Sequence, residues 1–261
     1  SNLTFETDHS LSKLVSGTIG DLASLNVNKG TLTYDKQTGK IGNLKVTGGL
    51  DIGTNTVNAT NVDFKDNSNL ALRVAATDNY GKINADNITI GKDTTMKVTL
   101  DNGVVGNGEN TDLKFLNGKV TGSFTNKIAE NSRYDIKWNE DGSLSITGTA
   151  TASDVVVDAG GSANNAKTAE AWDSVTSSTT ASAGAKAVAS VLGDLSQNAT
   201  TAAGQKAYVD ALTAVAPEVA PMVQKTQTET ANQVFGAVST RLTGGSISTG
   251  SEAVSYPHLT L

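Results

Sequence analysis

An internal repeat is the feature that most constrains how this chain folds. Two short apolar segments with a polar gap between them occur in residues 61–74, and the same pattern returns 26 residues later in residues 87–100. The repeated positions are Asn61, Val62, Phe64, Leu70, Leu72 and Val74, matched by Asn87, Ile88, Ile90, Met96, Val98 and Leu100. Alternation with a period of two places the apolar side chains of this set on one face of a strand. The gaps, rich in Asn, Asp and Lys, are where each strand turns.

Repeated strand–turn–strand units bury their inner faces by stacking on one another. Shorter versions of the pattern occur earlier, where Leu25 and Val27 are followed by Leu44 and Val46. Thin coils of small side chains fit the composition, since aromatic residues make up only 5% of the chain. We therefore predict an all-β fold, a right-handed parallel β-helix (solenoid) within residues 1–157, followed by a loosely packed α-helical C-terminal segment.

The last part of the predicted solenoid, residues 113–157, is richer in aromatic side chains. Phe115, Phe124, Tyr134 and Trp138 lie in it, and residues 134–146 have the pattern of a hairpin that turns at 139–142. The open end of a sheet needs cover against other chains. We therefore predict that this part caps the solenoid.

The sequence changes character after Val157. Residues 158–205 are rich in Ala, Ser, Thr and Gly with only weak helical patterning, which predicts a linker with marginal helices. Within residues 206–245, a thin apolar stripe with helical spacing begins at Pro221 and ends before Gly244. Its opposite face is rich in Gln, Lys, Glu and Asn, which predicts a helix in polar surroundings.

Two stretches resemble the bacterial autotransporter family of type V secretion. Residues 134–147 (Y-D-I-K-W-N-E-D-G-S-L-S-I-T) are similar to the last coils of the passenger domain, the autochaperone-like part that begins folding outside the cell. Residues 211–242 (A-L-T-A-V-A-P-E-V-A-P, later N-Q-V-F-G-A-V-S-T-R-L) are similar to the segment that lies inside the translocator barrel. Residues 246–261 are too few for a membrane barrel, so we expect a truncated lead-in to one.

The resemblance implies a fragment of a surface-displayed passenger, an adhesive or structural stalk, with a translocation (pore) helix in residues 206–245. The implied partner is a C-terminal outer-membrane β-barrel around the segment from Pro221 to Leu242. The implied location is the bacterial outer membrane, the cell surface or the secreted fraction, and the ligand stays open. Some members of the family cleave themselves at an Asn pair in the pore helix. Here Asn232 is followed by Gln233, and the pair Asn164–Asn165 lies in the predicted linker, so self-cleavage is not expected.

The net charge, the cysteine content and the hydropathy of the chain limit the class of protein to which it can belong. A net charge of −6 and a pI of about 4.9 argue against nucleic acid, which needs a basic face. The chain contains no Cys and no apolar run long enough for a transmembrane helix. It starts at Ser1 without a leader-like sequence, so we expect it to have been cut from a longer protein.

No catalytic, cofactor or metal site is expected. The two histidines, His9 and His258, lie near the chain ends, which does not suit a catalytic triad or a histidine metal site. The glycine-rich stretch 48–53 occurs once, without the repeats of calcium-binding solenoids. The stretch 103–108 lacks the Lys-Ser/Thr of a phosphate loop. The first stretch is expected to be a turn, and no phosphate site is expected at the second.

Two other classes of function remain open. In a polysaccharide-degrading β-helix enzyme, Asp63, Asp66, Asp86 and Asp93 would have to cluster on one face, although their placement favours turns, and Trp138 would stack on sugar rather than cap the solenoid. A phage tail fibre would be trimeric and would leave the polar helix unexplained. The sequon Asn87-Ile88-Thr89 is expected to begin a strand.

Overall fold

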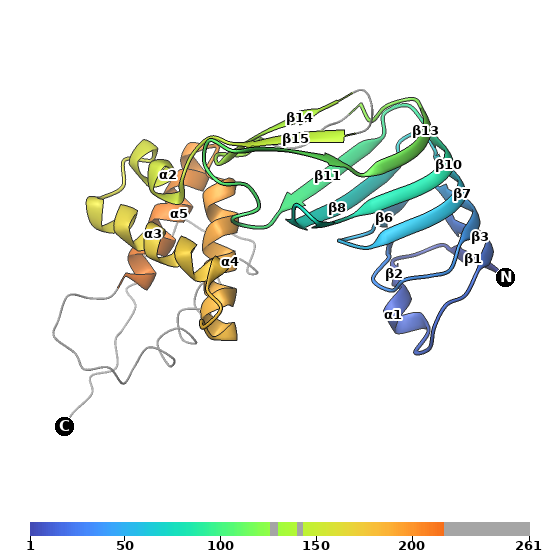
Figure 1. The fold of residues 1–261 in the computed structure, drawn as a ribbon, viewed down its shortest axis with the longest axis horizontal. Helices are drawn as coiled ribbons and strands as arrows, with labels where there is room; N and C mark the ends of the chain where they lie inside the picture. The colour runs from blue at the N-terminus through green and yellow to red at the C-terminus, as the bar shows by residue number, and fades with distance from the viewer. Residues whose placement is uncertain (126–129, 140–142, 217–261) are drawn as a thin grey trace, which may run out of the picture.

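The protein consists of a β domain (residues 1–148) and a helical unit (residues 152–215) that lie along one axis (Figure 1). The structure is a computed structural model that describes residues 1–125, 130–139 and 143–216. Strands account for 40% of the described residues and helices for 26% of them, so the fold is mixed α/β. The expectation of an all-β solenoid is therefore wrong.

Two parallel sheets form most of the β domain. The strands of sheet A, in spatial order, are β1 (Asn2–Phe5), β3 (Leu22–Val27), β5 (Ile41–Val46), β7 (Thr56–Phe64), β10 (Lys82–Ile90) and β13 (Leu116–Thr121). Those of sheet B are β2 (His9–Ser10), β4 (Thr31–Thr33), β6 (Gly49–Asp51), β8 (Asn69–Ala76) and β11 (Thr95–Leu100), with β9 (Asn79–Tyr80) antiparallel to β8. The short helix α1 (Leu11–Leu14) follows β2. The chain alternates between the sheets, and we call one passage through both a coil.

The register of the strands confirms the repeat read from the sequence. Asn87 pairs with Asn61 and Ile90 with Phe64 in sheet A, and Val98 pairs with Leu72 in sheet B. Leu72 is 2% exposed, and Val98 is partly buried against the same core. Both side chains point inward as expected, because alternate residues of a strand share a face.

Amide side chains form ladders between coils on sheet A. Asn61 Nδ2 donates to Asn43 Oδ1 at 3.0 Å, and Asn87 Nδ2 donates to Asn61 Oδ1 at 3.0 Å. Asn117 Nδ2 donates in the same way to Asn84 Oδ1 at 2.9 Å. These bonds link the same position of successive coils, so side chains reinforce the backbone pairing. Asn87 of the sequon lies within β10, as expected from the sequence.

An antiparallel sheet lies at the C-terminal end of the parallel sheets. It consists of β12 (Asn110–Lys114), β15 (Ser143–Gly148) and β14 (Tyr134–Trp138). Strands β14 and β15 form the expected hairpin. The rings of Phe115 and Trp138 are 4.8 Å apart, and Phe124 lies 5.5 Å from Phe64 and 6.0 Å from Trp138. These contacts join the antiparallel sheet to the core of the coils.

Four helices form the second unit: α2 (Ala152–Asp158), α3 (Ala163–Ser177), α4 (Ala183–Gln197) and α5 (Ala202–Val215). Each begins at a Ser or Thr whose side chain accepts a backbone hydrogen bond, namely Thr151, Ser162, Ser182 and Thr201. Such caps satisfy N–H groups that a helix leaves unpaired at its start. Their buried residues make one core, which includes Val156, Leu192, Tyr208 and Leu212.

The helical unit overturns the expectation of a linker over residues 158–205. The many Ser and Thr residues cap helices, and the many Ala residues are strong helix formers whose small side chains let helices pack closely. Of the predicted pore segment 206–245, residues 206–215 belong to α5, and its Tyr208 and Leu212 are buried in the core. Residues 217–245 and the expected lead-in 246–261 lie outside the described residues. No helix in the described part of the chain is long and apolar enough to cross a membrane.

Candidate functional site at the junction of the two units

The β domain and the helical unit meet at a polar junction. Their buried apolar residues form two separate clusters, one made of strand residues and one of residues from α2 to α5. The segments that meet are residues 100–102 at the end of β11 and just after it, residues 131–133 before β14, and helices α3 and α4. The junction depends on the hydrogen bonds and the ion pair described next.

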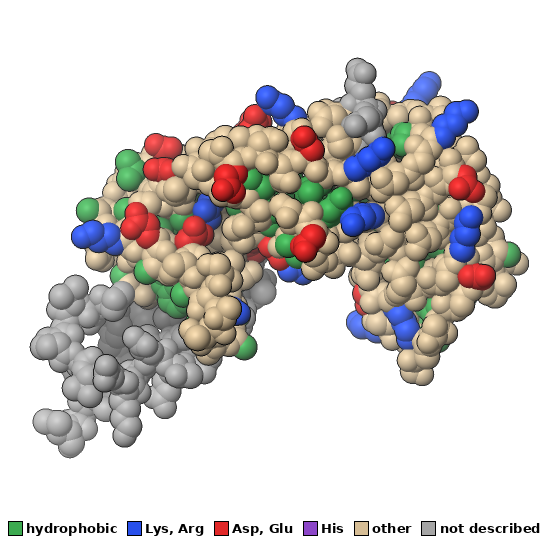
Figure 2. All heavy atoms as spheres, viewed as in Figure 1, with side chains coloured by type: hydrophobic (Ala, Val, Ile, Leu, Met, Phe, Trp, Pro, Cys, Tyr) green, Lys and Arg blue, Asp and Glu red, His purple; other side chains and the backbone are tan. Residues whose placement is uncertain are grey.

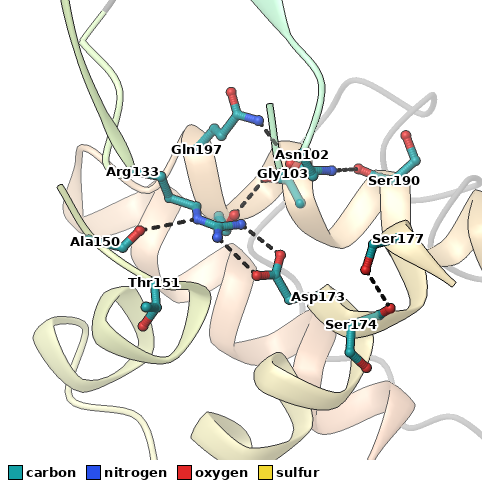
Figure 3. A network of polar contacts seen from close by, with 12 residues as sticks. Asn102, Gly103, Arg133, Ala150, Thr151, Asp173, Ser174, Ser177, Ser190 and Gln197 are labelled. Atoms are coloured by element: carbon teal, nitrogen blue, oxygen red, sulfur yellow. Dashed lines mark hydrogen bonds and ion pairs between the residues drawn. The ribbon is translucent and has the colours of Figure 1, made fainter. Parts of the chain in front are cut away.

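Gln197, at the end of α4, makes the largest set of these bonds. Its side-chain Nε2 donates to the Leu100 carbonyl at 2.9 Å and to Asn102 Oδ1 at 2.8 Å (Figure 3). Its Oε1 accepts from Asn131 Nδ2 at 2.9 Å, and its backbone carbonyl accepts from Ser132 N and Oγ, each at 2.9 Å. The residue is only 6% exposed, so its polar atoms are satisfied by the β domain rather than by water.

Asn102 approaches α4 at a glycine. Its Nδ2 donates to the Ser190 carbonyl at 3.3 Å (Figure 3). A Cβ added to Gly193 would lie 1.7 Å from the Asn102 Nδ2. Glycine inside a helix costs about 1 kcal/mol relative to Ala. Its place in the third turn of α4 is therefore explained by the close approach of Asn102.

A buried ion pair joins residues 131–133 to α3. Arg133 Nη1 and Nη2 donate to Asp173 Oδ1 and Oδ2 at 2.8 and 3.0 Å, and Arg133 Nε donates to the Ala150 carbonyl at 3.4 Å (Figure 3). The side chains are 7% and 32% exposed. Burial lowers the pKa of Arg133, but the Asp173 carboxylate outweighs burial and raises it. The guanidinium stays charged, so removal of Asp173 would leave a buried charge unpaired.

Two tyrosines close to the ion pair are kept protonated. Tyr134 accepts a hydrogen bond from Gly103 N at 3.3 Å, and Tyr208 is 1% exposed. Burial is the largest influence on both and raises the pKa of each phenol, although the charge of Arg133 opposes it. Neither is suited to act as a base near neutral pH.

Three charged groups lie on the other side of the junction. Arg73 of β8 donates through Nε to Asp101 Oδ1 at 2.7 Å. Asp194 of α4 lies close to this pair, and its pKa is raised by burial and then by Asp101, while Arg73 lowers it. Arg73 thus pairs with Asp101, and its charge offsets part of the rise in the pKa of Asp194.

A cavity of about 580 Å³ lies beside the ion pair. Its lining is Asn102, Gly103, Thr151, Ala152, Ser153, Glu170, Asp173, Ser174, Thr176 and Ser177. Asp173 already binds Arg133, and the Thr151 side chain caps α2. Most of the polar atoms that could turn to a ligand are hydroxyls, which do not define one class of ligand.

The aspartates considered for sugar cleavage serve other contacts. Asp63 pairs with Lys65, and Asp86 lies 3.8 Å from Lys40. Asp66 accepts the backbone N–H of Lys92 at 2.8 Å in a turn. Asp93 lies in the equivalent turn one coil later. In the described ranges, no three His, Cys, Asp or Glu side chains come together as metal ligands.

The remaining singled-out residues lie far from the junction or are structural. The ring of His9 packs against Phe5 at 5.4 Å, while His258 and Asn232 lie outside the described residues. Of the stretch 48–53, Asp51 accepts the N–H of Gly53 at 3.0 Å, as in a turn. Trp138 packs among the rings of Phe115 and Phe124.

Basic side chains do not gather on the face seen in Figure 2. Lys and Arg side chains are scattered over the β domain, and acidic ones are interspersed with them and spread over the helical unit. This agrees with the acidic pI.

The junction residues were missed by sequence reasoning. Residues 151–154 and 162–165 form capping boxes, the first with Thr and Asp and the second with Ser and Asn, and these would have predicted helices. Gly193 within a helical pattern would have indicated a close approach. No family model, curated protein or solved structure matches this chain.

Proposed function

We propose that this chain is part of a bacterial autotransporter passenger: a surface-displayed adhesive or structural stalk with an export segment in residues 217–245, after α5. The observation that carries the proposal is the order of its parts. Coils of parallel strands are followed by an antiparallel hairpin and then by helices. The stretch 211–242, which resembles the barrel-spanning segment, begins in the last residues of α5 and continues beyond it.

The coils have the properties that a stalk needs. Each strand of sheet A from β3 to β10 has a parallel neighbour on both sides, and Asn ladders add bonds between coils. Such a structure needs neither disulfides nor a thick aromatic core, and the chain has no Cys. A role as a spacer or binding surface is favoured over sugar cleavage because the four candidate aspartates are placed in separate ion pairs and turns.

Surface display provides the test. The chain is placed between a secretory signal peptide and an outer-membrane β-barrel, with an epitope in the exposed turn at residues 77–78. In a matched variant, residues 217–242 are replaced by a Gly/Ser sequence of equal length. We expect the epitope to be reached by antibody on intact cells for the natural sequence, and to stay inside for the variant. Equal display by both would refute the export segment.

The enzyme alternative has its own assay. The purified chain is incubated with a panel of bacterial and plant polysaccharides, and released reducing ends are measured. We expect none above a control without protein. If reducing ends are released and this release disappears in an Asp63→Asn or Asp86→Asn variant, the chain is a hydrolase and the stalk proposal fails.

A further inference from the structure

We propose that the helical unit is a reversible clamp on the C-terminal end of the coils, which docks and undocks as a body while both units stay folded. In the docked state, α4 covers the end of β11, and α3 holds the segment before β14 through Arg133. The proposal concerns these described contacts and does not depend on the export function.

The two separate cores are the first argument. Each unit buries its own apolar residues, and the contacts between the units are polar. Each hydrogen bond between the units is exchanged for one to water when they separate, so its net loss is small, whereas exposure of an apolar core has no such compensation. Separation of the units therefore costs less than unfolding of either one.

The contact with the helical unit lies at the end of an edge strand of sheet B. Strand β11 is the last strand of sheet B in the spatial order. The carbonyl of Leu100, its final residue, accepts from Gln197 Nε2 at 2.9 Å. In the docked state, the helical unit thus supplies a side-chain donor to the carbonyl at the end of the edge strand. After undocking, this carbonyl would be hydrogen-bonded to water instead.

Gly193 is the third argument. Asn102 occupies the space in which a side chain at 193 would lie. Alanine there would favour the helix itself, yet it would push Asn102 away from Ser190 and Gln197. The residue therefore serves the contact between the units and works against the stability of α4 alone.

These features separate docking from folding experimentally. The full chain has no Cys, so Lys97→Cys on β11 and Lys186→Cys on α4, both exposed, can carry a donor and an acceptor dye. Single-molecule energy transfer then reports docking. Hydrogen exchange of the Ser132 N–H, which is bonded to the Gln197 carbonyl across the junction, reports it independently.

In the natural sequence, we expect Ser132 to exchange at least tenfold faster than the central amides of β10 under conditions that leave circular dichroism unchanged, because a tenfold ratio corresponds to about 1.4 kcal/mol. In Gly193→Ala, we expect a further acceleration of roughly tenfold at Ser132 and a new low-transfer population. Amides within α4 and β10 should keep their protection. The matched control is Gly184→Ala, an exposed position in the first turn of α4, which should leave both readouts unchanged.

A second substitution guards against a trivial loss of structure. Asn102→Ala combined with Gly193→Ala removes the collision and should restore high transfer, supported by Arg133 and Gln197. The proposal is overturned if Ser132 exchanges at the rate of the β10 amides. It is also overturned if Gly193→Ala leaves docking intact, if it abolishes protection throughout α4, or if the double variant stays undocked.

Discussion

Asn67 and Asp93 occupy the same position in successive coils, and both have a positive φ, 63° and 54°. Each lies in the turn between sheet A and sheet B, where Asn67 N donates to the Lys92 carbonyl of the next coil at 2.9 Å. The repeat therefore extends beyond the strands to the left-handed conformation of a single residue. This conformation costs free energy for residues other than glycine, and the cost is smaller for Asn and Asp than for the others.

Glycine at these positions should stabilise the β domain. We expect Asp93→Gly to raise the free energy of unfolding by about 0.5 kcal/mol, because glycine adopts a positive φ without strain. Asn67→Gly should raise the free energy of unfolding by less, because Asn tolerates a positive φ better than Asp does. Urea denaturation followed by circular dichroism measures both. Asp63→Gly, in a strand and paired with Lys65, is the control and should lose stability; a loss at Asp93 of similar size would contradict the argument.

Gly118 should be among the least replaceable residues of the β domain. Its φ is 140°, and a Cβ there would lie 1.8 Å from the Ala85 carbonyl oxygen of β10. We expect Gly118→Ala to cost about 3 kcal/mol or more, since strain and a backbone collision add. Gly103→Ala isolates the conformational part, because Gly103 has a φ of 77° with nothing within 4 Å. Equal thermal shifts for the two variants would show that the collision is relieved cheaply.

A charge in the core of the coils should be severely destabilising. We expect Leu72→Asp to lower the free energy of unfolding by several kcal/mol, about 3–5, because an unpaired charge loses its water. Val98→Asp, one coil later and only partly buried, should cost less. Lys97→Asp, exposed between inward residues, is the control with a small effect. Chemical denaturation of the three proteins orders them, and the reverse order for Leu72 and Lys97 would refute the inward assignment.

The pH dependence of stability should change when Asp194 is neutralised. Burial and Asp101 raise the pKa of Asp194 above its ordinary value of 3.8, so its ionised form is disfavoured in the folded protein. This penalty is present at neutral pH and disappears as pH falls below 3.8, where the carboxyl is protonated in both states. We expect Asp194→Asn to be more stable than the natural sequence at pH 7, by a small amount because the side chain is partly solvated. Thermal melts at pH 7 and pH 3 measure this; an advantage that persists at pH 3 would contradict it.

The coils could be predicted because their evidence is local. Alternation, polar gaps and the offset between Asn61 and Asn87 are visible in the sequence, and the register follows from them. The hairpin of residues 134–148 was predictable for the same reason. Strand periodicity survives even in a chain with few large side chains, because only every second position must be apolar.

The helical unit was not predictable from the same signal. Its helices use Ala, Ser and Thr where larger apolar residues usually form a stripe, so periodicity was weak and the composition resembled a linker. The junction lies still further from local patterns: Gln197 contacts Leu100 across 97 positions of the sequence. Nothing near either residue in the sequence indicates its partner.

The in-register pairing of coils has a consequence for how such a chain changes length. Val62 pairs with Leu44 on one side and with Ile88 on the other, and Asn61 likewise joins Asn43 to Asn87. At these positions, the coil that contains Val62 therefore pairs with its successor through the same residues that pair with its predecessor. Excision or duplication of residues 61–86 would place matching residues opposite one another again. Removal of this coil would therefore shorten the β domain, and its duplication would lengthen it. In both cases the hairpin and the helices would keep their own contacts.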